Sequence, residues 1–126
     1  MGLIFTTLTL SNPVKASLKP IDVNSMVDTG ASHLCIPEHI AIQLELTELE
    51  KREVRVADGS IKLCSYMGPI KVHFENRSCF TGALVIGDVV LLGSIPMEDL
   101  DILINPKLQK VVVNPTNPNI ASAVVM

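Results

Sequence analysis

A chain of 126 residues is long enough for one domain with a modest core and too short for two lobes. Apolar residues make up 48% of the chain and aromatic residues only 3%, so the core must be built from Val, Ile and Leu. Branched residues at this density favour strands. The formal net charge of −3 provides no basic face for phosphate backbones, so nucleic acid is not an expected partner.

The cysteines and the N-terminus bear on the compartment. Cys35, Cys64 and Cys79 are far apart and form no C-x-x-C pair, so the sequence indicates neither a disulfide framework nor a zinc site. They are expected to be reduced core thiols of a cytoplasmic protein that needs no metal or other cofactor. The apolar N-terminal segment is too short to cross a bilayer, so it is expected to be a strand and no membrane partner is expected.

The first part of the chain is expected to be extended and to end in a short helix. After a break at Asn12-Pro13, apolar and polar residues alternate over residues 14–19, which predicts a half-buried strand. Pro37 and Glu38 suit a first helical turn and predict a helix to about Leu44. The charged residues that follow are expected to form a solvated connection. By number, the other expected strands are 3–10, 21–27 and 34–36, and the connection is 45–53.

The second part is expected to be a series of short strands. Asp58-Gly59 is a strong hairpin signal and predicts a two-stranded arm over residues 53–67. Short strands with frequent turns indicate an all-β barrel or sandwich. Residues 1–114 are expected to form the domain, and residues 115–126, with two Asn-Pro breaks, a C-terminal tail. The remaining expected strands are 70–75, 79–85, 89–92, 101–104 and 111–113, with helical turns over 96–100.

Asp28, in the triplet Asp28-Thr29-Gly30, is the candidate for chemistry. One interpretation is a plain turn, because Asp caps local amides and Gly accepts a positive φ. The surroundings favour a site: the triplet follows the apolar pair Met26-Val27, and some sixty residues later a second apolar run ends at Gly93 and leads into a short helix. The hairpin signal lies between the two.

These features together resemble the retropepsin-like aspartic proteases, the homodimeric relatives of pepsin. The matching segments are residues 26–32 for the catalytic motif, Ala57-Asp58-Gly59-Ser60 for the tip of the flap, and Leu91-Leu92-Gly93 with residues 96–100 for the second loop and its helix. The resemblance covers roughly residues 3–114. It implies an all-β fold, a closed β-barrel half with one or two short helices and an active site on a two-fold dimer axis.

The resemblance also implies roles for single residues. Asp28 would be catalytic and contributed by each of two chains, and Thr29, Gly30 and Ala31 would form the loop that braces the dimer. The flap would close over an extended peptide or protein substrate. Leu92 and Gly93 would form the second loop. The implied activity is that of an aspartic endopeptidase.

The chemistry explains why one motif per chain requires two chains. Peptide hydrolysis needs a carboxylate that takes a proton from water and a carboxylic acid that polarises the scissile carbonyl, and one Asp cannot be both at once. Two carboxylates about 4 Å apart repel by roughly 4 kcal/mol at an effective dielectric near 20. That repulsion is enough to keep one proton shared between them.

Two residues depart from the viral pattern. Viral members pair an acidic residue two places after the motif glycine with an Arg after the second-loop glycine, whereas this chain has Ser32 and Ser94. Both halves of the pair are absent together, so no buried charge is stranded, and the chain resembles cellular and bacterial members. His33 is expected to be carried away from the site by the strand that follows it.

Two other functions are open on the sequence. The chain could be a non-catalytic peptide-binding or assembly module that keeps the fold, although a scaffold has no need for two repelling carboxylates at its centre. It could also be a monomer that assembles only with a partner. Interleaving of residues 3–10 with residues 121–126 in a dimer is a further expectation from the resemblance.

Overall fold

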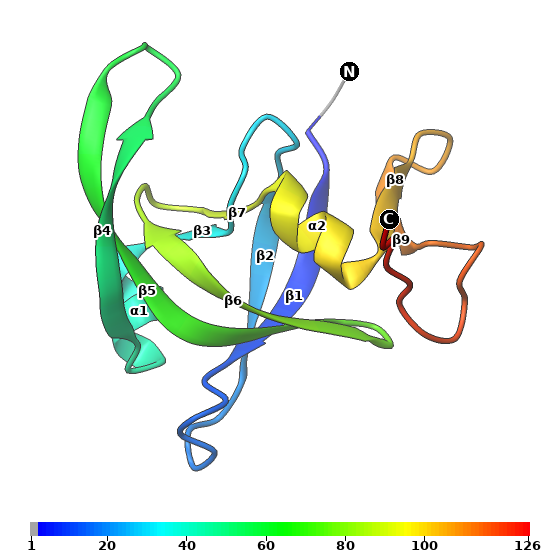
Figure 1. Cartoon of the computed structure of the whole chain (residues 1–126), viewed down its shortest axis with the longest axis horizontal. Coiled ribbons are helices and arrows are strands. Elements are labelled where there is room, and N and C mark those ends of the chain that lie inside the picture. Colours follow the sequence, from blue (N-terminus) through cyan, green and yellow to red (C-terminus); the bar gives the residue numbers. More distant parts are fainter. Residues whose placement is uncertain (1–2) are drawn as a thin grey trace.

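The computed structural model describes residues 3–126, and its main feature is a closed barrel (Figure 1). The first two residues of the expected domain lie outside the described part. The hydrogen-bonded order is β1-β2-β7-β3-β6-β5, and β5 also pairs with β1, which closes the six strands. The strands are β1 (Phe5–Ser11), β2 (Ile21–Val27), β3 (Cys35–Ile36), β4 (Thr47–Arg55), β5 (Ile61–Phe74), β6 (Arg77–Val85), β7 (Val90–Leu92), β8 (Ile102–Asn105) and β9 (Lys110–Val113).

The barrel encloses an aliphatic core, as the composition predicts. Leu8 and Leu10 on β1 and Ile70 and Val72 on β5 alternate with more exposed neighbours and are fully buried. Burying each such side chain contributes about 1.5–3 kcal/mol. The expected all-β fold with a closed barrel is therefore confirmed.

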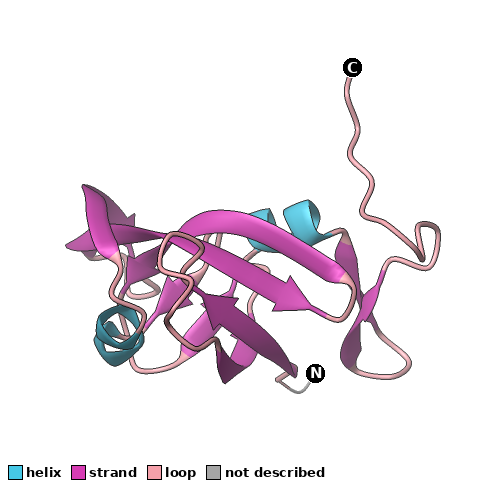
Figure 2. Ribbon diagram, turned by 90° about the horizontal axis from the view of Figure 1, so that it is seen from below, coloured by secondary structure: helices cyan, strands magenta, loops and turns pink. Residues whose placement is uncertain are grey.

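Two short helices pack apolar residues against the core of the barrel. Helix α1 (Glu38–Gln43) begins after Pro37 and buries Ile40 and Ala41, and helix α2 (Ser94–Leu100) follows β7 directly. Both helices were predicted from the sequence within two residues at each end. Figure 2 shows α1 and α2 at separate places on the strands.

The strand predicted for residues 14–19 is wrong. This segment is a series of turns, and Val14 is 73% exposed. The Asn12 side chain explains the difference, because its Oδ1 accepts hydrogen bonds from the main-chain N–H groups of Val14 and Lys15. Its Nδ2 donates to the Leu44 carbonyl at 2.9 Å and fixes the turn on the body. Alternation without a partner strand does not make a strand.

The solvated connection predicted for residues 45–53 is also wrong in most of its length. Strand β4 occupies Thr47–Arg55 and pairs with β5 in an antiparallel arm that is longer than the predicted arm, 53–67. Almost all of β4 faces solvent, so the strand does not need apolar residues at alternate positions. Its sequence therefore lacks the pattern by which a strand is identified. Cross-strand polar contacts support it instead, such as the Lys51 Nζ that lies 3.5 Å from the Ser65 hydroxyl.

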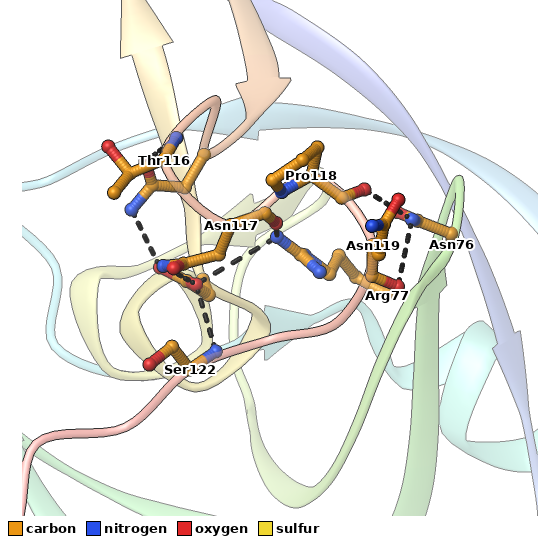
Figure 3. Close-up of polar contacts among 9 residues, drawn as sticks. Asn76, Arg77, Thr116, Asn117, Pro118, Asn119 and Ser122 are labelled. Atoms are coloured by element: carbon orange, nitrogen blue, oxygen red, sulfur yellow. Dashed lines mark hydrogen bonds and ion pairs between the residues drawn. The ribbon is translucent and has the colours of Figure 1, made fainter.

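The C-terminal segment is held on the body by Asp101, the residue after α2, and by Arg77, which lies beside Asn117 of that segment in Figure 3. The Asp101 carboxylate accepts hydrogen bonds from the Asn114 side chain at 3.0 Å, the Asn117 side chain at 2.8 Å and the Ser122 main-chain N–H at 3.0 Å. The buried Arg77 guanidinium donates to the Asn117 carbonyl and lies 3.8 Å from the Asp101 carboxylate. The chain is thus anchored as far as Ser122, and its C-terminal end points away from the strands (Figure 2).

This cluster predicts a pH dependence of stability. The hydrogen bonds from Asn114, Ser122 and Asn117 hold the pKa of Asp101 below its ordinary value of 3.8. Because the folded pKa is lowered, the stabilisation is complete above pH 3.8 and is lost as the pH falls through the folded pKa. We expect the melting temperature of the wild type to fall more steeply below this pH than that of Asp101→Asn. Asp88→Asn is the control, and identical slopes in Asp101→Asn and wild type would contradict the expectation.

Candidate active site

Asp28 is positioned by two parallel strands. It follows β2 directly, β2 runs parallel to β7, and Val27 is opposite Leu92 in the register. The Asp28 main-chain N–H donates to the Leu92 carbonyl at 3.0 Å, which extends the pairing by one residue. The two apolar runs that the sequence singles out therefore lie side by side, and the carboxylate stands where they end.

The chain turns sharply after Asp28. One carboxylate oxygen, Oδ1, accepts a hydrogen bond from the Gly30 N–H at 3.0 Å, and the Asp28 carbonyl accepts one from the Ala31 N–H at 3.1 Å. A Cβ on residue 30 would lie 3.2 Å from Oδ1, so glycine leaves the room that this carboxylate needs. Asp28 is half-buried and Thr29 is exposed. The turn thus presents a fixed carboxylate at a surface that solvent or another chain can reach.

The second loop braces the first through main-chain hydrogen bonds. The Ser94 N–H donates to the Ala31 carbonyl and the Ile95 N–H donates to the Ser32 carbonyl, each at 2.9 Å. Gly93 packs so closely that a Cβ there would lie 2.4 Å from the His33 carbonyl oxygen. These contacts hold the loop after Asp28 in place at Ser32 and Ser94, the two positions where the viral pattern has an acidic residue and an Arg.

A cleft of about 620 Å³ opens beside Asp28. One part of its wall is the loop after β2, another is the end of β4 with the first residues of the arm's turn, and β3, β6, β7 and the turn between β6 and β7 supply the rest. The lining is mainly aliphatic. Its residues are Asp28, Gly30, Ala31, Ser32, His33, Cys35, Val54, Arg55, Val56, Ala57, Leu84, Ile86, Gly87, Asp88, Val89 and Leu91.

The tip of the arm is a well-formed turn that projects from the barrel (Figure 1). The Ser60 N–H and hydroxyl donate to Asp58 Oδ1 at 2.8 and 2.6 Å, and these bonds lower the pKa of Asp58. Gly59 has a φ of 87°, which favours glycine. Of the four residues that the sequence proposes for the tip, only Ala57 lines the cleft; Asp58, Gly59 and Ser60 form the turn beyond it.

The comparisons with known proteins agree with this geometry. A family profile described as aspartyl protease matches residues 14–119. The chain belongs to the aspartyl protease family. Among solved structures it is similar to the retroviral protease-like domain of Ddi1 from Leishmania major, with a TM-score of 0.61 and 13% identity over 91% of this chain and 90% of that one. It is also similar to a retropepsin-like aspartic protease from Rickettsia conorii, with a TM-score of 0.53 and 18% identity over 80% and 75% of the two chains. No match was found among curated proteins.

The cysteine in the cleft of this aspartyl protease is not a competing nucleophile. Burial, the nearby Asp28 carboxylate and Cys64 together raise the pKa of the Cys35 thiol to about 11. A thiol with so high a pKa stays protonated at neutral pH and reacts poorly. Cys35, Cys64 and Cys79 are all buried and free, as expected.

The prediction that His33 is carried away from the site is wrong, because His33 lines the same cleft as Asp28. Its ring lies within hydrogen-bond distance of the Ser32 hydroxyl, at 2.6 Å, and of Arg52 on β4, at 2.9 Å. Both ring nitrogens of His33 thus have a polar partner. Sequence reasoning missed Arg52, and no local signal identifies it because its partner lies 19 residues earlier.

Within residues 3–126, no set of three or more His, Cys, Asp or Glu side chains is grouped so that it could hold a metal ion. The helices in that same part of the chain are too short for a membrane span. The site itself contains the Asp28 carboxylate, main-chain N–H donors and a cleft lined mainly by aliphatic side chains.

Proposed function

We propose that this aspartyl protease is a homodimeric endopeptidase that cleaves extended polypeptides, with residues 1–114 as the protease domain and residues 115–126 as a tail. Asp28 from each chain supplies one half of the catalytic pair. The free buried cysteines support a cytoplasmic location.

The observation that carries the proposal is the place of Asp28. The carboxylate is half-buried, is fixed by the Gly30 N–H and stands in a cleft walled by the arm. A cleft of about 620 Å³ with an aliphatic lining suits a peptide segment and its side chains. One chain offers one such carboxylate, so a second copy is needed to provide both a base and an acid.

In the proposed dimer the two Asp28 carboxylates face each other and share one proton. The ionised one takes a proton from the attacking water molecule while the protonated one donates to the scissile carbonyl oxygen, which gives a gem-diol intermediate. The two residues then exchange roles within the same turnover: the first gives its proton to the leaving amine nitrogen and the second takes one from the gem-diol, so the C–N bond breaks and the starting protonation is restored. Thr29, which is exposed in the single chain, would bond across the axis. The β4–β5 arm would cover the substrate and exclude bulk water from the reaction.

Mixing subunits tests the shared site. Wild-type protein, which should cleave an unstructured peptide library, is equilibrated with a ninefold excess of Asp28→Asn chains. If each active site needs Asp28 from both chains, most wild-type chains end in mixed dimers, and the activity per wild-type chain falls by about tenfold. Sedimentation at the same concentrations checks that dimers form.

A different result would contradict the proposal. Full activity per wild-type chain in the mixture would show that one Asp28 is sufficient. A well-folded wild type that binds peptides without cleaving them would favour a non-catalytic binding module. A statine-type inhibitor distinguishes a protease from a binding module further. At 100 times its Kd it should stabilise a protease by about 2.7 kcal/mol, whereas an unchanged melting temperature would favour the binding module.

A further inference from the structure

A chain of polar contacts links the catalytic loop to the arm. The Ser32 hydroxyl lies 2.6 Å from His33 Nδ1, and His33 Nε2 lies 2.9 Å from a terminal nitrogen of Arg52. The Arg52 guanidinium stacks over the Tyr66 ring at 4.0 Å, and the His33 ring meets the same tyrosine edge-on at 6.0 Å. Four side chains from three segments thus form one cluster beside the cleft.

The arginine fixes where the proton on His33 must be. A guanidinium has only donors, so Arg52 donates and His33 Nε2 must be an unprotonated acceptor. The neutral ring then carries its proton on Nδ1, where it can donate to the Ser32 oxygen. The contact between the loop and the arm therefore exists only while His33 is neutral.

The rest of the cluster holds Arg52 in place. Its Nε donates to the Glu50 carboxylate at 2.7 Å on the same strand. The Tyr66 hydroxyl accepts a hydrogen bond from the Gly82 N–H at 3.2 Å, and the ring occupies the space that a Cβ on residue 82 would take, only 2.4 Å from its nearest ring atom. The tyrosine is thus a fixed platform under the guanidinium.

We propose that Arg52 is a positioning residue that, through neutral His33, holds the arm over the cleft, and that protonation of His33 releases the arm. The catalytic consequence rests on the proposed protease function. Arg52 lies on β4 two residues before Val54, so movement of Arg52 shifts the wall that Val54 and Val56 give to the cleft. Release of the arm weakens the binding of an extended substrate and raises KM.

The groups around His33 set the direction of the pH effect. Arg52 faces it from β4 and Tyr66 from β5, Asp28 and Cys35 lie on its own loop and strand, and Glu50 approaches Arg52. Two charges at the cleft, Arg55 and Asp88, also line the space. Burial and then Arg52 lower the pKa of His33 below 6.5, so the contact is complete at neutral pH and is lost as the pH falls through that lowered pKa.

Steady-state kinetics at pH 7 and at a lower pH, at which the NMR signals of the His33 ring show it to be protonated, test the contact. We expect the KM of the wild type for an unstructured peptide to rise by about fivefold over this interval, more than its kcat changes. His33→Gln can accept from Arg52 without titrating, so its KM should stay flat. Arg52→Gln should have the high KM at both pH values. Lys62→Gln, which removes an exposed cation on β5 of the same arm, is the control and should behave as wild type.

Amide hydrogen exchange separates this inference from the proposed protease function. In an Asp28→Asn background, residues 54–57 of Arg52→Gln should exchange about fivefold faster at pH 7 than those of Lys62→Gln, and the difference should disappear at a pH at which His33 is protonated. Equal exchange at pH 7 would overturn the positioning role even if the enzyme cleaves peptides. A KM of Arg52→Gln that follows the wild-type profile would overturn it as well. If the amides of Arg52→Gln exchange faster but the wild type has no peptidase activity, the positioning role of Arg52 stands and only the proposed protease function is rejected.

Discussion

Replacing Asp28 with Asn is expected to abolish peptide cleavage, with a loss of at least about a thousandfold in kcat. The carboxamide cannot take a proton from water, and a dimer of two substituted chains has neither the base nor the acid. The fold should be unaffected, because the carboxamide oxygen can still accept the hydrogen bond that the Gly30 N–H makes to Asp28 at 3.0 Å. The measurement is the initial rate of cleavage of an unstructured peptide library, with the melting temperature recorded for each protein.

A matched control lies at the other end of the same strand. Asp22 on β2 accepts a hydrogen bond from the Thr9 hydroxyl at 2.7 Å and lies outside the cleft, so Asp22→Asn makes the same chemical change away from the site. We expect it to keep wild-type activity. Residual cleavage by Asp28→Asn at more than about a tenth of the wild-type rate would reject Asp28 as a catalytic group.

Much of the fold could be predicted because its signals are local. Buried runs around Asp28 and before Gly93, the Asp58-Gly59 turn and Pro37 at a helix start each depend on a few neighbouring residues. The family profile and the two solved structures confirm the retropepsin-like fold that these signals indicate together. The local signals alone indicate an all-β barrel or sandwich, and the resemblance of the ordered motifs to the retropepsin-like proteases predicts the closed barrel.

The errors arose where side-chain contacts or strand pairing, and not apolar periodicity, decide the structure. Residues 14–19 alternate like a strand, but the Asn12 side chain holds them in turns against Leu44. Strand β4 is almost entirely exposed, so only its pairing with β5 identifies it as a strand. The contact between His33 and Arg52 joins the loop after Asp28 to that strand and could not be predicted before the strand itself was known.

Replacing Gly93 with Ala is expected to lower the free energy of unfolding by about 3 kcal/mol and to reduce cleavage together with it. The added Cβ would lie 2.4 Å from the His33 carbonyl oxygen and 2.8 Å from both the Ala31 carbonyl oxygen and the His33 nitrogen. All three are main-chain atoms, so no side-chain rotation relieves the clash. Denaturant unfolding with the cleavage rate measured on the same samples checks the prediction.

The backbone angles show that space, and not conformation, requires glycine at this position. Gly93 has a φ of −85° and a ψ of −179°, which alanine adopts without strain, so a loss of stability would come from the contact with the catalytic loop. Ser94→Ala is the matched control, since the Ser94 main-chain N–H that bonds to Ala31 is retained. An alanine at residue 93 that is as stable and as active as the control would mean that the second loop does not brace Asp28. A loss of stability and of cleavage in Gly93→Ala but not in Ser94→Ala would show that close main-chain packing performs the bracing that an acid–Arg pair performs in the viral pattern.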